Sequence, residues 1–426
     1  MNKNSINTLY DSLWIHDVNT RISKTAILAG SPDQIIILLS DKLIAIDSIL
    51  PVIMEIKEEN KGIRIKFLFL RKESITSVKN NYIIWNAMRK IGDIDFLFYG
   101  GTGIKQSKVK RVYSILRLLI NLYDLLKNKT LLFYRGELSA FPVWLLVNMV
   151  HRGGGAVVTF SALSYPISEA LANHFWVRNK EPIVDQRGVH RRLQGDRHLV
   201  FHPKQIHYES LFTSSSMVVC GSSRRFPMWT KYLNDIFINE PFIDINGSKI
   251  DLCGKKSVAV FYPGNHSLAD LKESDSCHRK FLSILSALSA QKELVVLLKP
   301  HVICDINELL EDIKQFPALD IHITNAHPQL LAKTVIAAFL PNGSAVMDDL
   351  YCEGVPIIES AEYIDEVLVR GGSFYPNIGR TTCLDDKKLV ALIHALIKDT
   401  SEIKKPDACH LIWPKPKRIS PLLWEN

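Results

Sequence analysis

ELVVLLKPH at 293–301 opens a stretch, ending at residue 360, that contains three short apolar runs: LVVLL at 294–298, VIAAFL at 335–340 and VPII at 355–358. Each run is continuous rather than alternating and is rich in β-branched or large side chains, which is typical of strands covered on both faces of a parallel sheet. Segments with helical spacing separate the runs, at 306–316, 328–333 and 344–352. Strands that alternate with helices build right-handed crossovers. The stretch therefore predicts an α/β domain with a parallel sheet.

Polar residues follow two of these strands at the point where each strand ends. Lys299-Pro300-His301 comes after the first run and Pro341-Asn342-Gly343-Ser344 after the second. In an open parallel sheet the ligand crevice lies at the carboxyl ends of the strands, so both segments are expected to line one site. A Gly-Ser pair at the start of a helix offers backbone N–H groups, a hydroxyl and the positive end of the helix dipole, and Lys and His add cationic donors. The pattern predicts a bound phosphate or diphosphate, with an ordinary helix N-cap as the alternative role of Ser344.

Three more side chains are candidates for the same site. Asp349 and Glu353 lie four residues apart on the helix expected after Ser344, where either carboxylate could accept hydrogen bonds from ribose hydroxyls. An exposed acidic helix face is the alternative. His266 follows the strand expected at 257–262 and is a candidate ligand for a phosphate or a carboxylate.

The segments LLKPH at 297–301 and NGSAVMDDLYCEGVPII at 342–358 resemble the carboxyl-terminal domain of GT-B glycosyltransferases that build bacterial surface polysaccharides. The most similar groups carry a His-Pro motif and a later Ser motif: sialyltransferases, Kdo (3-deoxy-manno-octulosonic acid) transferases and CDP-glycerol polymerases. Here the first motif reads Pro300-His301 and the second Gly343-Ser344. GSSRRF at 221–226 resembles the TGSPRFD signature that precedes the interdomain linker in the same enzymes.

The resemblance implies a GT-B fold, that is, two Rossmann-like doubly wound domains facing a central cleft. It implies a nucleotide-sugar donor, CMP- or CDP-activated and carrying a sugar acid such as Kdo or sialic acid, with a lipid-linked lipopolysaccharide or capsule glycan as acceptor. No cofactor is expected beyond the donor. A CDP-glycerol-type polyol-phosphate transferase and a non-catalytic or epimerase-type relative stay open as alternatives. Together, residues and resemblance predict these donor-binding positions: Gly221, Ser222, His266, Lys299, His301, Asn342, Gly343, Ser344 and Asp349.

Glu137 is the predicted acid–base residue. It follows the strand expected at 130–134 and Arg135-Gly136, which places it at the catalytic edge of the first domain. Sugar transfer needs a carboxylate or a histidine that deprotonates the acceptor hydroxyl, or a carboxylate nucleophile. Asp235 and Asp185 are weaker candidates, and stabilising a helix amino terminus is the alternative role of Glu137.

A catalytic metal is not expected. Asp93-Ile94-Asp95 precedes its strand, and no DxD pair follows a strand as a metal-dependent transferase would need. Basic residues and helix dipoles would then stabilise the leaving nucleotide.

Composition narrows the class of protein and its compartment. The 426 residues are 47% apolar and 23% charged, which allows two domains with substantial cores. Seven scattered cysteines without CxxC spacing argue against a disulfide framework or a zinc site. No apolar stretch has transmembrane length, and no signal-like region follows the first residues. We therefore expect a cytoplasmic protein, and peripheral contact with the cytoplasmic face of the inner membrane stays open.

The net charge of +8 is concentrated in basic stretches at 105–117, 187–197 and 415–418. Such stretches attract nucleic acid, anionic lipid and anionic sugars alike, and a solvated surface is the plain alternative. No nucleic-acid-binding motif accompanies them, so nucleic acid is not an expected partner.

Strands and helices are predicted to alternate along the rest of the chain. Expected strands lie at 25–30, 63–70, 94–99, 130–134, 156–160, 217–220 and 257–262, and expected helices at 82–91, 109–127, 141–151 and 387–397. The apolar segment 34–50 fits either a helix or a strand, and 230–256 is predicted to be a connector. We expect an acceptor domain at 1–240, a nucleotide-sugar domain at 241–400, and a tail at 401–426 that packs back on the first domain.

Overall fold

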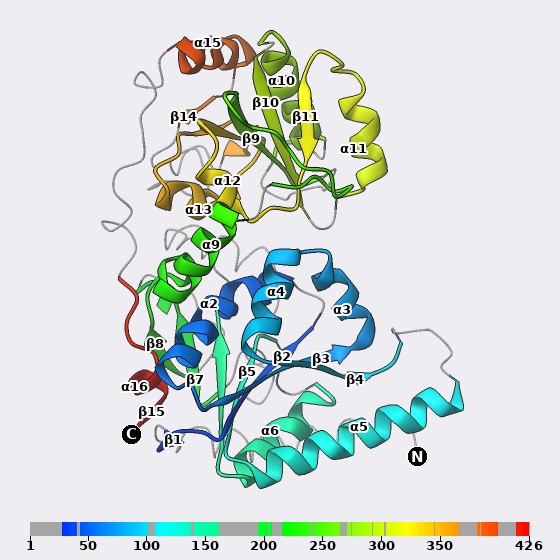
Figure 1. The fold of residues 1–426 in the computed structure, drawn as a ribbon, viewed down its shortest axis with the longest axis vertical. Coiled ribbons are helices and arrows are strands. Elements are labelled where there is room, and N and C mark those ends of the chain that lie inside the picture. The colour runs from blue at the N-terminus through cyan, green and yellow to red at the C-terminus, as the bar shows by residue number, and fades with distance from the viewer. Residues whose placement is uncertain are drawn as a thin grey trace. The chain divides into compact units, whose positions relative to one another are not determined.

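The computed structural model describes residues 28–40, 43–100, 107–136, 138, 140–161, 195–203, 205–206, 215–239, 242–264, 271–273, 275–291, 293–301, 304–344, 346–365, 381–383, 385–398 and 415–425. The chain forms two compact units: unit 1 comprises 1–230 with 414–426, and unit 2 comprises 231–413 (Figure 1). The division falls inside helix α9 (Pro227–Asn239). Each unit is built on its own parallel sheet.

The described part of unit 1 contains a seven-stranded sheet. Its order is β4 (Asp93–Phe98), β3 (Arg64–Arg71), β2 (Gln34–Leu39), β5 (Thr130–Tyr134), β6 (Ala156–Phe160), β7 (Arg197–Val200) and β8 (Ser216–Val219). All neighbouring strands pair in parallel. The chain moves outward from β2 to β4, returns to β5 beside β2 and then moves outward on the other side. This is a doubly wound sheet, and its switch point lies between β2 and β5.

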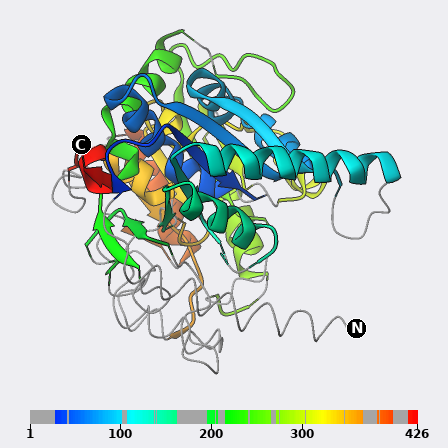
Figure 2. The same ribbon diagram turned by 90° about the horizontal axis from the view of Figure 1, so that it is seen from below.

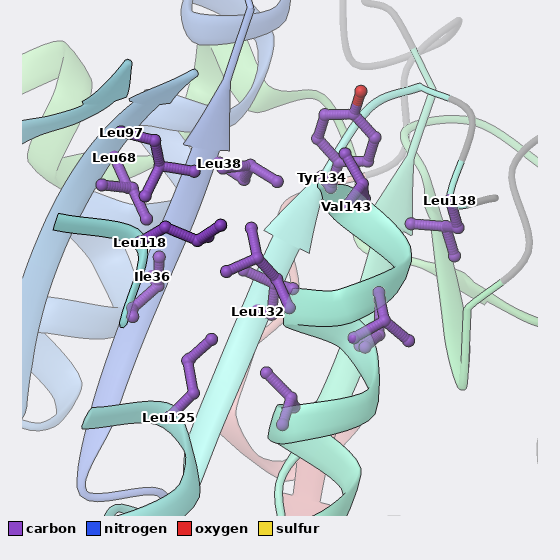
Figure 3. Packing of buried hydrophobic residues seen from close by; sticks show 14 residues of the cluster. Ile36, Leu38, Leu68, Leu97, Leu118, Leu125, Leu132, Tyr134, Leu138 and Val143 are labelled. Carbon is purple, nitrogen blue, oxygen red and sulfur yellow. The ribbon is translucent and has the colours of Figure 1, made fainter. Parts of the chain in front are cut away.

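Helices cover both faces of the unit 1 sheet, and apolar side chains fill the space between. The helices are α2 (Leu43–Glu59), α3 (Lys72–Lys79), α4 (Tyr82–Ile91), α5 (Lys108–Lys127) and α6 (Val143–Arg152). Figure 3 shows the core beneath α5 and α6, where Leu118 and Leu125 of α5 pack with Ile36 of β2 and Leu132 of β5. Helices α2 and α4 lie on the other face (Figure 1). Burial of these residues is what fixes the helices on the sheet.

Residues 415–425 pack within unit 1. Strand β15 (Trp424–Glu425) pairs in parallel with β1 (Leu28–Ala29), and the Trp424 side chain is completely buried. Ahead of β15, the short helix α16 (Ser420–Leu423) lies against the end of α2. There the backbone N–H groups of Ile419 and Ser420 donate to the Glu59 carboxylate, at 3.2 and 2.9 Å.

The described part of unit 2 contains a six-stranded parallel sheet. Its order is β11 (Asp320–Ile323), β10 (Leu294–Pro300), β9 (Lys256–Tyr262), β12 (Ala337–Leu340), β13 (Ile357–Glu359) and β14 (Thr381–Thr382). The helices are α10 (Ser276–Ser289), α11 (Ile306–Ile313), α12 (Pro328–Ala332), α13 (Val346–Cys352) and α15 (Asp386–Lys398). This sheet is also doubly wound, and its switch point lies between β9 and β12.

The predicted fold class is confirmed, since both units are doubly wound α/β domains. The ambiguous segment 34–50 contains both structures, strand β2 followed by the start of α2. In the segment 230–256, predicted to be a connector, α9 occupies the first part, and the division between the two units falls within this helix. Trp229, Leu233 and Ile236 are buried at helical spacing on one side of α9, and their burial stabilises the helix.

Candidate functional site in unit 2

Three strand ends meet at the switch point of the unit 2 sheet. Pro300 of β10 pairs with Tyr262 of β9, and Phe339 of β12 pairs with Val260 on the other side of β9. The segments that leave β10, β9 and β12 therefore emerge side by side at one edge. That edge, at a switch point, is where open α/β sheets bind ligands. The structure thus brings the two polar segments predicted from the sequence to one place.

The segment after β10 is held against β9. The backbone N–H of His301 donates to the Tyr262 carbonyl at 2.8 Å, while the His301 side chain is exposed and the Lys299 side chain is half-buried. The Tyr262 ring is buried and stacks on Phe281 with ring centroids 4.0 Å apart. Burial raises the pKa of Tyr262 well above its ordinary value, so the phenol stays neutral. The edge therefore combines a buried, stacked aromatic pair with an exposed imidazole and a half-buried ammonium in the neighbouring segment.

The segment after β12 presents an amide, a glycine and a hydroxyl. Asn342 is buried, and Gly343 and Ser344 are half-buried. The Ser344 Oγ accepts a long hydrogen bond of 3.5 Å from the backbone N–H of Val346, which is an N-cap contact for α13. Because α13 has only seven residues, its dipole is a weak source of anion binding. The candidate site therefore needs the side-chain donors Asn342, Lys299 and His301 in addition to the helix start.

Buried carboxylates lie close in the chain to these donors. Asp349 on α13 is 1% exposed, so the alternative of an exposed acidic face does not apply to it. Glu353 instead forms an ion pair with Lys333 at 3.1 Å. Asp348, next to Asp349, is equally buried.

Sequence reasoning missed the end of β13, which borders β12 at the same edge. Glu359 pairs with Leu340 in the sheet and is completely buried, and its Oε1 accepts a 2.5 Å hydrogen bond from the Tyr363 hydroxyl. The Ser360 N–H donates to the Leu340 carbonyl at 2.8 Å. A glutamate that directly follows an apolar run was the available signal, because a strand end at this edge is where polar side chains reach a ligand.

This arrangement suits a nucleotide. Lys299, His301 and the Asn342 amide are donors for phosphate oxygens, and a carboxylate at a nearby strand end is the usual acceptor for ribose hydroxyls. Tyr262, which ends β9 at this edge, is buried, and a low-dielectric surrounding strengthens such contacts.

Two of the predicted donor-binding residues, Gly221 and Ser222, belong to unit 1 and lie in a segment that contacts the tail. Gly221 has φ +89°, and a Cβ there would lie 2.7 Å from the Lys415 carbonyl oxygen, so close approach of the tail accounts for glycine at this position. Ser222 is 1% exposed. Arg224, in the same GSSRRF segment, pairs with Asp47 of α2. The segment therefore joins the tail and α2, and donor binding by Gly221 and Ser222 stays a prediction.

Of the three predicted catalytic residues, only Asp235 lies within the described part of the chain. Asp235 is exposed on α9, and its carbonyl accepts a 2.8 Å hydrogen bond from the Asn239 amide. Glu137, Asp185 and His266 lie outside the described residues. Among the residues that are described, no cluster of three or more His, Cys, Asp or Glu side chains could hold a metal ion. No helix in the described ranges combines the length and apolarity needed to cross a bilayer.

Comparison with known proteins identifies the fold. No known protein family matches the sequence, and no curated protein matches it. A Listeria monocytogenes protein assigned as a UDP-N-acetylglucosamine 2-epimerase has a similar structure, with a TM-score of 0.50 at 9% identity over 87% of this chain and 89% of that one. The UDP-GlcNAc 2-epimerase of Neisseria meningitidis bound to UDP-GlcNAc, and the glycosyltransferase of kitacinnamycin, each give 0.47 at 13% identity over 87% of this chain and 92% of theirs. At such identities the likeness to the Listeria structure shows the fold alone, which agrees with the predicted pair of doubly wound domains.

Proposed function

We propose that this chain is a glycosyltransferase whose unit 2 binds a nucleotide-sugar donor. One observation carries this proposal: the ends of β10 and β12 flank β9 at the switch point of the unit 2 sheet, and they carry Lys299, His301, Asn342 and Ser344. These side chains are donors for a diphosphate or phosphodiester, and buried carboxylates at the same edge suit a ribose.

In the proposed reaction an acceptor hydroxyl attacks the anomeric carbon of the donor sugar. The bond from that carbon to the nucleotide phosphate breaks, and the hydroxyl proton passes to a base. Lys299 and His301 are suited to stabilise the charge on the leaving phosphate, which would allow transfer without a metal ion. Glu137 is the base that we propose, with Asp235 as the alternative.

The donor we propose is CMP- or CDP-activated and carries a sugar acid such as Kdo or sialic acid. The resemblance of 297–301 and 342–358 to enzymes of bacterial surface polysaccharides supports this choice. A lipid-linked lipopolysaccharide or capsule glycan is the corresponding acceptor. The alternatives are a CDP-glycerol-type polyol-phosphate transferase and a non-catalytic or epimerase-type relative. The likeness in fold to the Listeria protein makes UDP-N-acetylglucosamine the ligand to test for the last of these.

Thermal unfolding of the protein with CMP, CDP, UDP, GDP and UDP-N-acetylglucosamine tests the proposal. A ligand that binds only the folded state stabilises it by about 2.7 kcal/mol at a hundred times its Kd, so the best ligand gives the largest rise in Tm. We expect CMP or CDP to give it, and we expect transfer to survive excess EDTA. If UDP-N-acetylglucosamine gives the largest rise in Tm, and the protein forms its 2-epimer without transferring the sugar, the epimerase alternative replaces the proposal. No response to any nucleotide would contradict nucleotide binding at this edge.

A further inference from the structure

Helix α5 presents an apolar face to solvent. Nine large apolar side chains on this helix are between 46% and 67% exposed: Val109, Val112, Tyr113, Ile115, Leu116, Leu119, Ile120, Tyr123 and Leu126. At about 100° per residue they form a continuous arc of roughly 160°, along a helix that is about 30 Å long. An exposed apolar surface of this extent on one element marks an interaction site.

The outward orientation of this face is fixed by the opposite side of α5. Ser114, Leu118, Asn121 and Leu125 are buried against the sheet. Polar contacts hold the same side: the Arg117 Nε donates to the Phe96 carbonyl at 2.7 Å, and the Lys66 Nζ donates to the Asn121 Oδ1 at 2.8 Å. Arg117 also pairs with Asp95. Rotating α5 to hide its apolar face would break these contacts and expose the leucines of Figure 3.

Positive charge lies at the two ends of the helix that carries the arc. Lys108, Lys110 and Arg111 lie in the first turn of α5, which has no acidic residue, and Lys127 ends the helix. Cations at a helix amino terminus oppose the helix dipole and do not stabilise the helix itself. Their position is explained if they contact negative charge outside the helix. Figures 1 and 2 both show α5 as a long straight helix at the periphery of unit 1, with its amino-terminal end extending past α6.

We propose that α5 docks unit 1 on the surface of an anionic lipid bilayer, lying in the plane of the interface. An exposed apolar arc on a helix that carries Lys and Arg at its ends suits an interfacial amphipathic helix, in which the apolar side chains enter the boundary between headgroups and acyl chains. The tyrosines Tyr113 and Tyr123 have both the apolar ring and the polar tip that this boundary favours. Six charged residues within α5 and its fixation on the sheet exclude a spanning role.

The charge pattern also distinguishes lipid from a second copy of this chain. A symmetric dimer places the same patch on both partners, so the basic ends of two α5 helices would lie against each other or beside basic neighbours. Like charges in an interface disfavour association, whereas phosphate headgroups complement them. This inference does not depend on the proposed nucleotide site, because α5 belongs to unit 1 and that site to unit 2.

Co-sedimentation of the full chain with lipid vesicles tests the proposal. The probes are vesicles of phosphatidylcholine alone and with roughly 30% phosphatidylglycerol, at low and at physiological salt. We expect binding to the anionic vesicles, weakened by salt, and much less binding to the neutral ones. Amide hydrogen exchange within 109–126 should become slower when anionic vesicles are added. This measurement uses the wild-type protein, so it remains valid even if a variant folds poorly.

Two sets of substitutions separate the apolar and the electrostatic contributions. The variant L116Q/I120Q/Y123Q, at the centre of the arc, should lower the partition coefficient on anionic vesicles by about 10²-fold. The variant K108Q/R111Q/K127Q should lower it by about 10²-fold at low salt and reduce the salt dependence. Ile238→Gln is the matched control, because Ile238 is 77% exposed on α9, outside the arc, and this change should leave vesicle binding as it is.

Several outcomes would overturn the docking proposal. Wild-type protein that fails to bind anionic vesicles would do so, as would unchanged binding by L116Q/I120Q/Y123Q. A wild-type dimer in sedimentation velocity that the same variant converts to monomer, together with no vesicle binding, would assign the face to a second copy. Because nucleotide binding is measured separately, none of these results bears on the proposed function.

Discussion

Arg224 binds Asp47 through two parallel hydrogen bonds, from Nη1 to Oδ1 at 2.8 Å and from Nη2 to Oδ2 at 2.5 Å. Arg224 lies in the short helix η1 (Ser223–Arg225) and Asp47 in α2, and both side chains are largely shielded from solvent. Removing one partner of such a pair leaves the other charge buried and unneutralised. We therefore expect Arg224→Met to lower the free energy of unfolding of unit 1 by about 3 kcal/mol, measured by denaturant titration.

Arg224→Lys serves as the control for this pair, because it keeps the charge and loses the planar fork. We expect it to recover only part of the lost stability. Wild-type stability in Arg224→Lys would show that the bidentate geometry has no role.

Gly221→Ala should destabilise unit 1 more than the same change elsewhere. The new Cβ would lie 2.7 Å from the Lys415 carbonyl oxygen, in a residue with φ +89°. Gly154, also in unit 1, has φ +73° and open space around it, so Gly154→Ala measures the cost of the left-handed backbone alone, about 1–2 kcal/mol. Urea titration of both variants should give the larger loss for Gly221→Ala, and equal losses would contradict the contact with the tail.

Two adjacent leucines on α5 provide an internal comparison of its two faces. Leu125→Ala removes a completely buried side chain from the core of Figure 3, and we expect a loss of about 2–5 kcal/mol in unfolding free energy. Leu126 is 46% exposed, and Leu126→Ala should change stability by less than about 0.5 kcal/mol. A comparable loss in the two variants would mean that the outward face of α5 is covered in the folded chain.

His301→Ala and Ser344→Ala should each weaken nucleotide binding by about tenfold or more, since each removes one donor to a charged phosphate. Isothermal titration with the nucleotide that gives the largest rise in Tm measures this. His394→Ala is the control, because His394 is an exposed histidine on α15 and does not belong to the segments that follow β10 and β12. Wild-type affinity in both site variants would remove them from the phosphate site.

Glu137→Gln keeps the shape of the side chain and removes its titrating group. If Glu137 is the base, the rate of transfer should fall by roughly 10²–10⁴-fold with little change in nucleotide affinity. If it only stabilises a helix amino terminus, the same variant should lose about 0.3–1 kcal/mol of stability and keep its activity. Measuring rate and stability on this one variant decides between the two roles.

Much of the fold was predictable because buried parallel strands have a strong local signal. The runs at 130–134 and 156–160 coincide with β5 and β6, and the helix expected at 82–91 coincides with α4. The missed elements have weaker signals. β11 (Asp320–Ile323) at the sheet edge alternates polar and apolar residues over only four positions, and α9 depends on burial by distant parts of the chain.

The sequence predicted where the candidate site lies but not the side-chain contacts within it. The alternation of strands and helices gives the positions of the strand ends, and these ends share one edge of a parallel sheet. The grouping of Lys299, His301 and Ser344 could therefore be inferred. The buried Glu359–Tyr363 hydrogen bond could not, because burial of a carboxylate depends on packing that no local pattern records. On α5, spacing alone did not show that Leu118 and Leu125 face the sheet while Leu119 and Leu126 face solvent.

The pairing of β1 with β15 sets an order of events during synthesis on the ribosome. Residues 231–413 are translated, and can collapse on their own sheet, before residues 415–425 exist. During that interval residues 1–230 lack β15, the partner strand of Leu28–Ala29, and the buried indole of Trp424. Nascent unit 1 therefore exposes apolar surface and a strand edge. Chaperones that bind such surfaces would therefore have access to residues 1–230 for longer than to unit 2.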